Sequence, residues 1–335
     1  MSKRINFAGF MRALALAGSL GLTLTVTLSA PAIAQSYPSR PVRMIVPWPA
    51  GGGTDITARK LAQDLSLIMG QPIIVDNRGG ANGIIGTEPA AHAAPDGYTI
   101  MVSTVTSHAS NPSMSKKLPY DSIKDFTPVT IVNSVPLVIV AHPSFPAKSV
   151  SEIVQMAKAK PGFLNYASFG TGSMSHLAGE MFKMMGDIEM THVPYKGGGP
   201  ALTDTMGGQV GIYFSGVNSA LPYIKSGKLK AIAVTGSTRS APLPDVPTVA
   251  ETYQFKGYEA VVPTGVWLPA GVSPDVVTKL HGFILKVVQS SQYRQANEAD
   301  GSEPVGNSPE QMAATIKSET EKLAKVIKIA GVRNE

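Results

Sequence analysis

Two glycine-rich segments of this sequence carry the residue types that could hold a small anion. The first, "PAGGGTD" at 49–55, follows the apolar run "VRMIV", and the second, "SFGTGSMSH" at 168–176, follows "LNYA". Both precede a helix-like pattern, and the first turn of a helix exposes unpaired N–H groups and a positive dipole end. Because glycine lets an anion approach the backbone, the segments predict two anion-binding helix starts. The alternative is that the glycines only permit tight strand-to-helix turns.

The first segment argues against a nucleotide phosphate as the anion. A P-loop requires Lys and then Ser or Thr directly after its last glycine. Here Gly53 is followed by Thr54 and Asp55, and a carboxylate at 55 would repel a doubly charged phosphate. The dinucleotide pattern G-x-G-x-x-G is absent from both segments. A small carboxylate therefore fits the segments better than a nucleotide does.

Catalytic and metal-binding patterns are weak. Ser173 and Ser175 lie close to His176 in sequence, but the G-x-S-x-G elbow is missing and neighbouring residues on a helix do not face each other. His176 is better explained as a hydrogen-bonding residue at a helix start. The six histidines lie at least 16 positions apart without an H-E-x-x-H motif, so only a site assembled in space could bind a metal. We expect no catalytic residue, no metal and no cofactor.

The N-terminus reads as a secretion signal. Three basic residues precede an apolar run at 13–30, and "AIA" at 32–34 predicts cleavage before Gln35. An uncleaved membrane anchor is the alternative, against which Pro31 and the lack of a basic stop-transfer flank argue. Removing those three basic residues from the 29 leaves 26 against 23 acidic residues. This mild charge, without basic runs interleaved with aromatics, does not imply nucleic acid binding. The chain has no cysteine, so it forms no disulfide.

Two stretches repeat one order of elements. Residues 54–69 carry apolar side chains at helical spacing, with Thr54 or Asp55 as N-cap and Gly70 as stop. Residues 164–186 again read strand, glycine turn, helix and glycine stop, with Leu177, Met181 and Met184 as the apolar stripe. Such alternation predicts two similar α/β lobes with mostly parallel sheets. The segments 127–140 and 258–271 are the best candidates for connecting strands.

Several side chains near the glycine turns could take part in binding. Trp48 would be either a wall of a pocket or a cover over the loop. Tyr195 and Lys196 precede another glycine run and could reach a ligand, although an exposed lysine is more often simply solvated.

The sequence resembles a known family. The segments that carry the resemblance are "VPWPAGGGTD", "APDGYT", "LPYDSIKDFTPV", "NYASFGTGSMSHLAGEMF", "HVPYKGGGPALTD" and "PLPDVPTVAE". In this order they resemble the Bug-type extracytoplasmic solute receptors, the substrate-binding subunits of tripartite tricarboxylate transporters. The resemblance covers the chain from about Tyr37 to its C-terminus.

This resemblance implies an α/β, two-lobed periplasmic binding protein fold (type II-like) with two crossover strands. Residues 35–135 with 262–335 would form the first lobe, and residues 136–261 the second. The implied function is capture of a small organic acid, dicarboxylic or aromatic, between the lobes. The receptor would be a periplasmic monomer that serves the transporter's membrane subunits and is not an enzyme. A ligand sensor or an enzyme on the same fold is the alternative.

The resemblance also implies which residues meet the ligand. The matching loops are 47–55 and 168–176, and "STVTSH" at 103–108 matches a further ligand-facing loop. Together with the side chains discussed above, the expected ligand-binding residues are Trp48, Ala50, Gly51, Gly52, Asp55, Ser103, Thr104, Ser168, Thr171, Ser173, His176, Tyr195 and Ser215.

One departure from the family bears on ligand class. Family members commonly read "GQVDLMFDNLPSALP", whereas this chain reads "GQVGIYFSGVNSALP", with Gly211 and Ser215 in place of two acids. A buried α-ammonium group needs an acidic or carbonyl partner. The departure therefore favours ligands that carry carboxylates and no ammonium group.

Overall fold

The computed structural model describes residues 37–115 and 117–332. The predicted signal peptide lies outside these residues. Within them, no helix is both long enough and apolar enough to cross a membrane.

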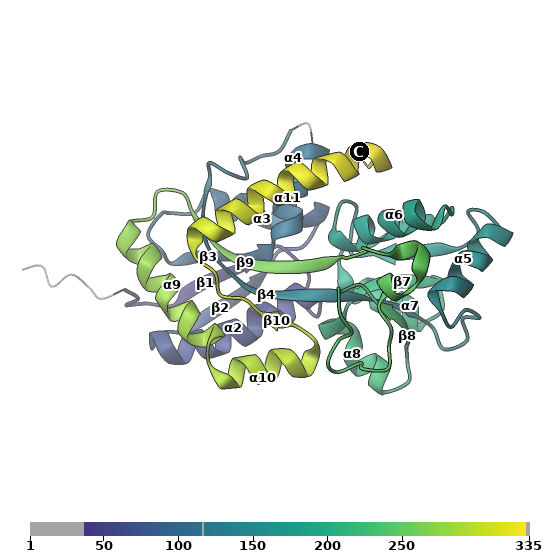
Figure 1. The fold of residues 1–335 in the computed structure, drawn as a ribbon. Helices are drawn as coiled ribbons and strands as arrows, with labels where there is room; N and C mark the ends of the chain where they lie inside the picture. Colours follow the sequence, from purple (N-terminus) through teal and green to yellow (C-terminus); the bar gives the residue numbers. More distant parts are fainter. Residues whose placement is uncertain (1–36, 116, 333–335) are drawn as a thin grey trace, which may run out of the picture. The chain divides into compact units, whose positions relative to one another are not determined.

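Helices and strands alternate along the chain (Figure 1). The strands are β1 Val42–Val46, β2 Ile73–Asn77, β3 Thr99–Thr104, β4 Phe126–Ala141, β5 Asn165–Ser168, β6 Thr191–Pro194, β7 Ile212–Gly216, β8 Lys230–Val234, β9 Val261–Pro269 and β10 Glu303–Pro304. The α-helices are α2 Gly53–Met69, α3 Ile84–Ala91, α4 Val105–Met114, α5 Val150–Ala159, α6 Met174–Gly186, α7 Gly198–Met206, α8 Val217–Lys225, α9 Pro274–Val288, α10 Ser291–Asp300 and α11 Pro309–Ala330. Short 3₁₀ turns lie at Ala81–Gly83, Val249–Glu251 and Tyr253–Phe255.

The strand order is β2-β1-β3-β9-β4-β7-β5-β6, with β8 and β10 also pairing with β4. We call the strands β1, β2, β3, β9 and β10 with residues 126–136 of β4 the first region. The second region is β5 to β8 with residues 137–141 of β4. In the first region β1 pairs in parallel with β2 and β3, and in the second β5 pairs in parallel with β6 and β7. The strands β4 and β9 are antiparallel to each other and to their neighbours β3, β7 and β8. The α/β class with two connecting strands is thereby confirmed.

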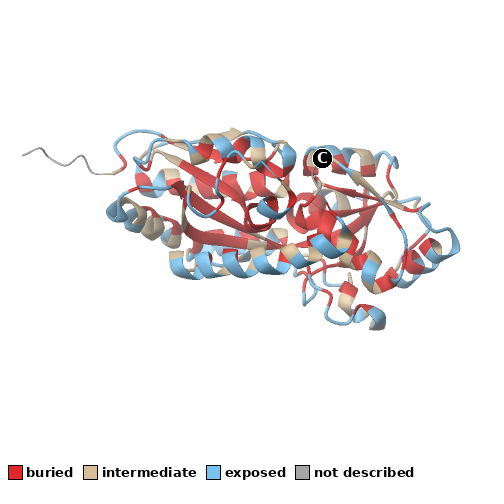
Figure 2. Ribbon diagram, turned by 90° about the horizontal axis from the view of Figure 1, so that it is seen from above, coloured by how far each residue is buried: buried red, intermediate tan, exposed pale blue. Residues whose placement is uncertain are grey.

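Helices cover both faces of each region, which leaves the central strands buried (Figure 2), whereas β2, β6 and β10 are partly exposed. In β1, Met44 and Val46 pack against α2 and α9, whereas Ile45 packs toward α4 and α11. In the second region α5 and α6 cover one face, and α7 and α8 cover the other. Strands buried on both faces need near-continuous apolar sequence, which explains the runs "VRMIV" and "TIMV".

Two local expectations were wrong. Helix α2 begins at Gly53 with Gly52 as its N-cap, rather than with Thr54 or Asp55. In α6 the buried stripe comprises Leu177, Ala178 and Phe182, whereas Met184 is 51% exposed. The sequence spacing was compatible with either stripe, and packing of Phe182 against the aromatic core of the second region selects the observed one.

Gly179→Ala and Gly282→Ala place the same substitution in α6 and α9, and we expect opposite effects. A Cβ on Gly179 would lie 2.1 Å from Cε2 of the buried Tyr166 ring, whereas a Cβ on Gly282 would meet nothing within 4 Å. Gly179→Ala should destabilise the protein by about 1–3 kcal/mol through overpacking. Gly282→Ala should stabilise it by about 0.5–1 kcal/mol through helix propensity. Urea unfolding measures both, and equal changes would contradict this packing of α6 on β5.

Candidate functional site

A cavity lies between the two regions, where β4 and β9 run side by side. It contains about 490 Å³ of space free of atoms, part of it open to solvent. Its floor comes from alternate residues of the two strands, the apolar Val135 and Leu137 of β4 and Val262 of β9, together with Thr264 of β9. Successive side chains on a strand point to opposite faces, so this spacing places all four on the same side. The connecting strands therefore form the floor of the cavity.

Three helices begin at this cavity. Residues of the first turns of α2, α7 and α8 line it, and their N-caps are Gly52, Gly197 and Gly216. None of these three glycines supplies a side-chain cap, unlike Ser173 at the start of α6, whose hydroxyl accepts a hydrogen bond from the His176 N–H. The positive ends of three helix dipoles thus converge on one cavity. Of the residues that the structure describes, no charged one lines it.

The loops that carry these helix starts touch across the cavity. The Asn218 side-chain amide donates to the Gly53 carbonyl at 3.2 Å, joining α8 to α2. Pro49 lies between two glycines, because a Cβ on Gly79 would be 2.5 Å and a Cβ on Gly197 2.6 Å from its ring. Only glycine at positions 79 and 197 allows the loop that carries Pro49 to lie this close to the other two loops.

Trp48 and Phe169 form an aromatic wall of the cavity. Their rings meet edge to face, with centroids 5.7 Å apart. Phe169 also packs against hydrophobic clusters of both regions. In the described part of the chain, neither Trp48 Nε1 nor Asn218 Oδ1 has a hydrogen-bond partner. The site therefore keeps one buried donor and one buried acceptor that the protein itself does not satisfy.

A second cavity shares the same two aromatic residues. It is lined by residues 80–82, 169–171 and 194–196 together with Trp48. Residues 80–83 all have positive φ, including Ala81 at 48° and Asn82 at 51°. A positive φ outside glycine costs roughly 1–2 kcal/mol per residue and is enriched at functional sites. The Asn82 side chain holds this strained turn, donating to Asn111 Oδ1 at 2.9 Å and accepting from Ser107 Oγ at 3.0 Å.

Only some of the residues expected to bind ligand in the loop 47–55 line the first cavity. Trp48 and Gly52 line the first cavity, whereas Ala50 and Gly51 are exposed on the loop. The Asp55 carboxylate does not line it. It accepts from Gly51 N at 2.9 Å, Asn77 Nδ2 at 2.9 Å and Arg59 Nε at 3.0 Å. Asp55 therefore holds the loop in shape.

The other expected residues differ in how close they lie to the two cavities. Thr171 and Tyr195 line the second cavity. Ser103 and Thr104 are buried beneath it, where Thr104 Oγ1 donates to Ser107 Oγ and so supports the Asn82 turn. Ser215 is buried behind the first cavity, with its Oγ 3.3 Å from the Oγ of Ser219, which lines it. Gly211 lies away from both cavities, beside Leu164 and Asn165.

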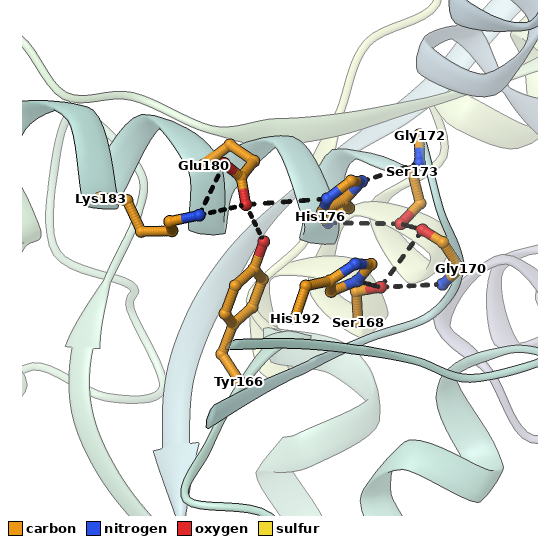
Figure 3. A network of polar contacts seen from close by, with 9 residues as sticks. All are labelled: Tyr166, Ser168, Gly170, Gly172, Ser173, His176, Glu180, Lys183 and His192. Atoms are coloured by element: carbon orange, nitrogen blue, oxygen red, sulfur yellow. Dashed lines mark hydrogen bonds and ion pairs between the residues drawn. The ribbon is translucent and has the colours of Figure 1, made fainter. Parts of the chain in front are cut away.

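Ser168, Ser173 and His176 line neither of the two cavities. Figure 3 shows them in a network of polar contacts. They belong to a buried network that also contains His192, Glu180 and Lys183. Burial lowers the pKa of His176 to about 4, with a smaller contribution from Lys183. Burial, followed by the neighbouring His176, lowers the pKa of His192 to about 3. Both imidazoles are therefore neutral at pH 7.

Sequence reasoning missed the loops 197–199 and 216–219 and the wall residues of β4 and β9. The run "GGGP" at 197–200 was visible as a glycine turn, and it has the same form as the first segment. The apolar wall carried no signal, because valine and leucine in a strand are the usual core residues.

Comparison with known proteins gives consistent matches over most of the chain. A family model described as "Tripartite tricarboxylate transporter family receptor" matches residues 57–332. Protein BugT of Bordetella pertussis is 37% identical over 313 residues, covering 92% of this chain and 95% of BugT.

Three solved structures are similar in both sequence and fold. An R. palustris protein solved with adipate is 35% identical with a TM-score of 0.86, covering 89% of this chain and 99% of its own. The periplasmic binding protein BugD is 35% identical with a TM-score of 0.84, covering 89% and 100%. MatC from Rhodopseudomonas palustris, solved with bound malate, is 32% identical with a TM-score of 0.81, covering 87% and 100%.

Gly197→Ala should separate the loops that meet over the first cavity. Its Cβ would overlap the Pro49 ring, and the φ of 133° is suited to glycine. Gly227→Ala is the control, because Gly227 also has positive φ, at 71°, but open space around it. Gly227→Ala should lose about 1–2 kcal/mol of unfolding free energy from its backbone conformation. Gly197→Ala should lose about 1–3 kcal/mol from its backbone conformation and more from the overlap with Pro49. Only Gly197→Ala should speed amide hydrogen exchange in residues 50–53, and equal exchange in both variants would contradict the contact.

Proposed function

Because this chain belongs to the tripartite tricarboxylate transporter receptor family, we propose that its cavities capture a small organic carboxylate. Its relatives are periplasmic solute-binding receptors, which confirms the expected fold and shows that the chain is a receptor rather than an enzyme.

The single observation that carries the proposal is the convergence of three uncapped helix starts on a cavity without charged side chains. A carboxylate placed there would accept hydrogen bonds from the first-turn N–H groups of α2, α7 and α8. Each hydrogen bond to a charged group contributes about 1.5–3 kcal/mol. Because the donors come from both regions, binding one carboxylate would also hold the regions together.

The rest of the ligand should be apolar and should lack an ammonium group. The floor formed by Val135, Leu137 and Val262 offers no partner to a polar chain. No acidic side chain of the described residues lines either cavity, so an α-ammonium group would have the neutral Asn218 Oδ1 but no charged partner to offset its desolvation. Relatives solved with adipate and with malate hold dicarboxylates. We therefore favour dicarboxylates or aromatic carboxylates, with a second acidic group directed past Trp48 toward Lys196 in the second cavity.

Capture would involve movement of two lobes, residues 35–135 with 262–335 and residues 136–261. The cavity lies at their junction, and β4 and β9 are the connecting strands.

The mature receptor would begin at Gln35, act as a periplasmic monomer and deliver its ligand to the membrane subunits of a tripartite tricarboxylate transporter. The intact mass of the secreted protein tests the processing step, and a mature form that retains Met1 would contradict it.

Ligand binding is tested by thermal unfolding and isothermal titration with adipate, malate and phthalate. Adipamide, which has the adipate chain without charge, is the matched control, and glutamate tests the ammonium argument. At about 100 times its dissociation constant a ligand adds about 2.7 kcal/mol of stability, so a clear rise in melting temperature is expected. Equal binding of adipate and adipamide would contradict the anion site. Glutamate binding more tightly than all three acids would contradict the ligand class.

Ser219→Asp should weaken carboxylate binding at least tenfold. Ser219 lines the first cavity in the first turn of α8, where an acidic side chain is favourable for the helix but repels an anion. Ser219→Asn is the matched control, because it has a similar shape without charge. Titration with the tightest-binding acid compares the two, after circular dichroism has shown that both are folded. If both variants bind the acid equally well, its carboxylate does not lie at the start of α8.

A further inference from the structure

Two stacked histidines lie directly behind the aromatic wall of the first cavity. His176 on α6 and His192 on β6 have ring centroids 3.7 Å apart and an interplanar angle of 8° (Figure 3). The Tyr166 ring extends the stack, 5.0 Å from His192. Since neither histidine lines the first or the second cavity, contact with a ligand bound there does not explain the arrangement.

Each histidine holds a different part of the loop 168–172. The Gly172 N–H donates to His176 Nδ1 at 3.0 Å. His192 Nε2 is hydrogen-bonded to Ser168 Oγ at 2.7 Å, and the same hydroxyl accepts from the Gly170 N–H at 3.1 Å. The two rings therefore hold the loop at both its beginning and its end.

The other side of this loop forms the binding site. Phe169 meets Trp48 edge to face, and Thr171 lines the second cavity. The Gly172 carbonyl accepts from Ser110 Oγ of α4 at 3.1 Å, which ties the loop to the first region. A shift of the loop would move the cavity wall and this contact together.

We propose that His176 and His192 are positioning residues: as a neutral stacked pair they fix Phe169 against Trp48, and protonation of the pair releases the loop and weakens ligand binding. The affinity part rests on the proposed function, whereas the locking of the loop does not. Nδ1 of His176 accepts a hydrogen bond only while it carries no proton. A proton there would turn the Gly172 contact into repulsion between two N–H groups.

The groups around the two histidines determine the pH at which the pair takes up a proton. The charged and titratable groups facing the pair are Glu180, with Oε1 3.8 Å from His176 Nε2, Lys183, which donates to Glu180 at 3.1 Å, and Tyr166, which donates to Glu180 Oε1 at 2.6 Å. Two charges on rings 3.7 Å apart are disfavoured, so the pair takes up one proton first. Because both folded-state pKa values lie below the usual 6.5, stabilisation is complete above about pH 6.5. It is lost as the pH falls toward about 4.

The test compares His176→Asn with His176→Leu. Asparagine Oδ1 can replace Nδ1 as acceptor but does not titrate, whereas leucine fills the space without an acceptor. Amide exchange of residues 169–172 in the full ligand-free chain should rise about tenfold in His176→Leu, as expected for one lost hydrogen bond, and should stay near wild type in His176→Asn at pH 7. His92→Asn, at an exposed histidine, is the control. Should His176→Leu fail to fold, Ser168→Ala removes the acceptor for Gly170 and should speed the same exchange.

The pH profile separates positioning from simple structural support. Between pH 6.5 and pH 4, wild-type exchange in 169–172, corrected for intrinsic rates, should rise about fivefold, and that of His176→Asn should not. Over the same pH interval, adipate affinity should fall about fivefold more in wild type than in His176→Asn. Adipate's own titration affects both proteins equally, so the comparison between them removes it. Failure of the wild type to bind adipate would count against the proposed ligand. The amide exchange of residues 169–172 would still test whether the histidines hold the loop. Unchanged exchange in folded His176→Leu and Ser168→Ala, or parallel pH profiles, would overturn the proposal.

Discussion

The backbone N–H groups at the starts of α2, α7 and α8 are the constraint on which the site depends. A helix start needs hydrogen-bond acceptors, and half of the α-helices in the described residues supply one from their own N-cap, such as Ser149, Ser290 or Ser308. At the cavity the N-caps are glycines, which leave that need to an external acceptor. A carboxylate would meet it with both charge and geometry, although none of the described residues that line the first cavity is a lysine or an arginine.

Glycine also allows the loops around the first cavity to approach one another closely. Glycine at 79 and 197 leaves room for Pro49, and Asn218 then reaches the Gly53 carbonyl from the opposite region. The proposed action of all three helix starts on one ligand depends on the meeting of these loops. Residues that do not line the first cavity, such as Asp55 and Asn82, hold the loop shapes that make this possible.

Much of this organisation could be predicted from local sequence patterns, and the rest could not. The glycine segments, the alternation of strands and helices and the two connecting strands were all visible, and the family resemblance is confirmed. The start of α8 was not, because Asn218 and Gly53 are 165 positions apart and no local pattern records their contact. For Ser173 and His176 the pattern was ambiguous. Ser173 caps its own helix and His176 holds Gly172, so both serve the loop from behind.

Trp48 gives the protein an internal optical reporter. The chain contains only two tryptophans, and Trp267 is fully buried against His108, away from the cavity. Trp48 instead forms a wall of both cavities, with an indole N–H that has no partner among the described residues. A molecule that enters either cavity changes the polarity around this indole, while Trp267 supplies a constant background. The fluorescence of the unlabelled chain therefore carries information about occupancy of the site, without any engineered dye.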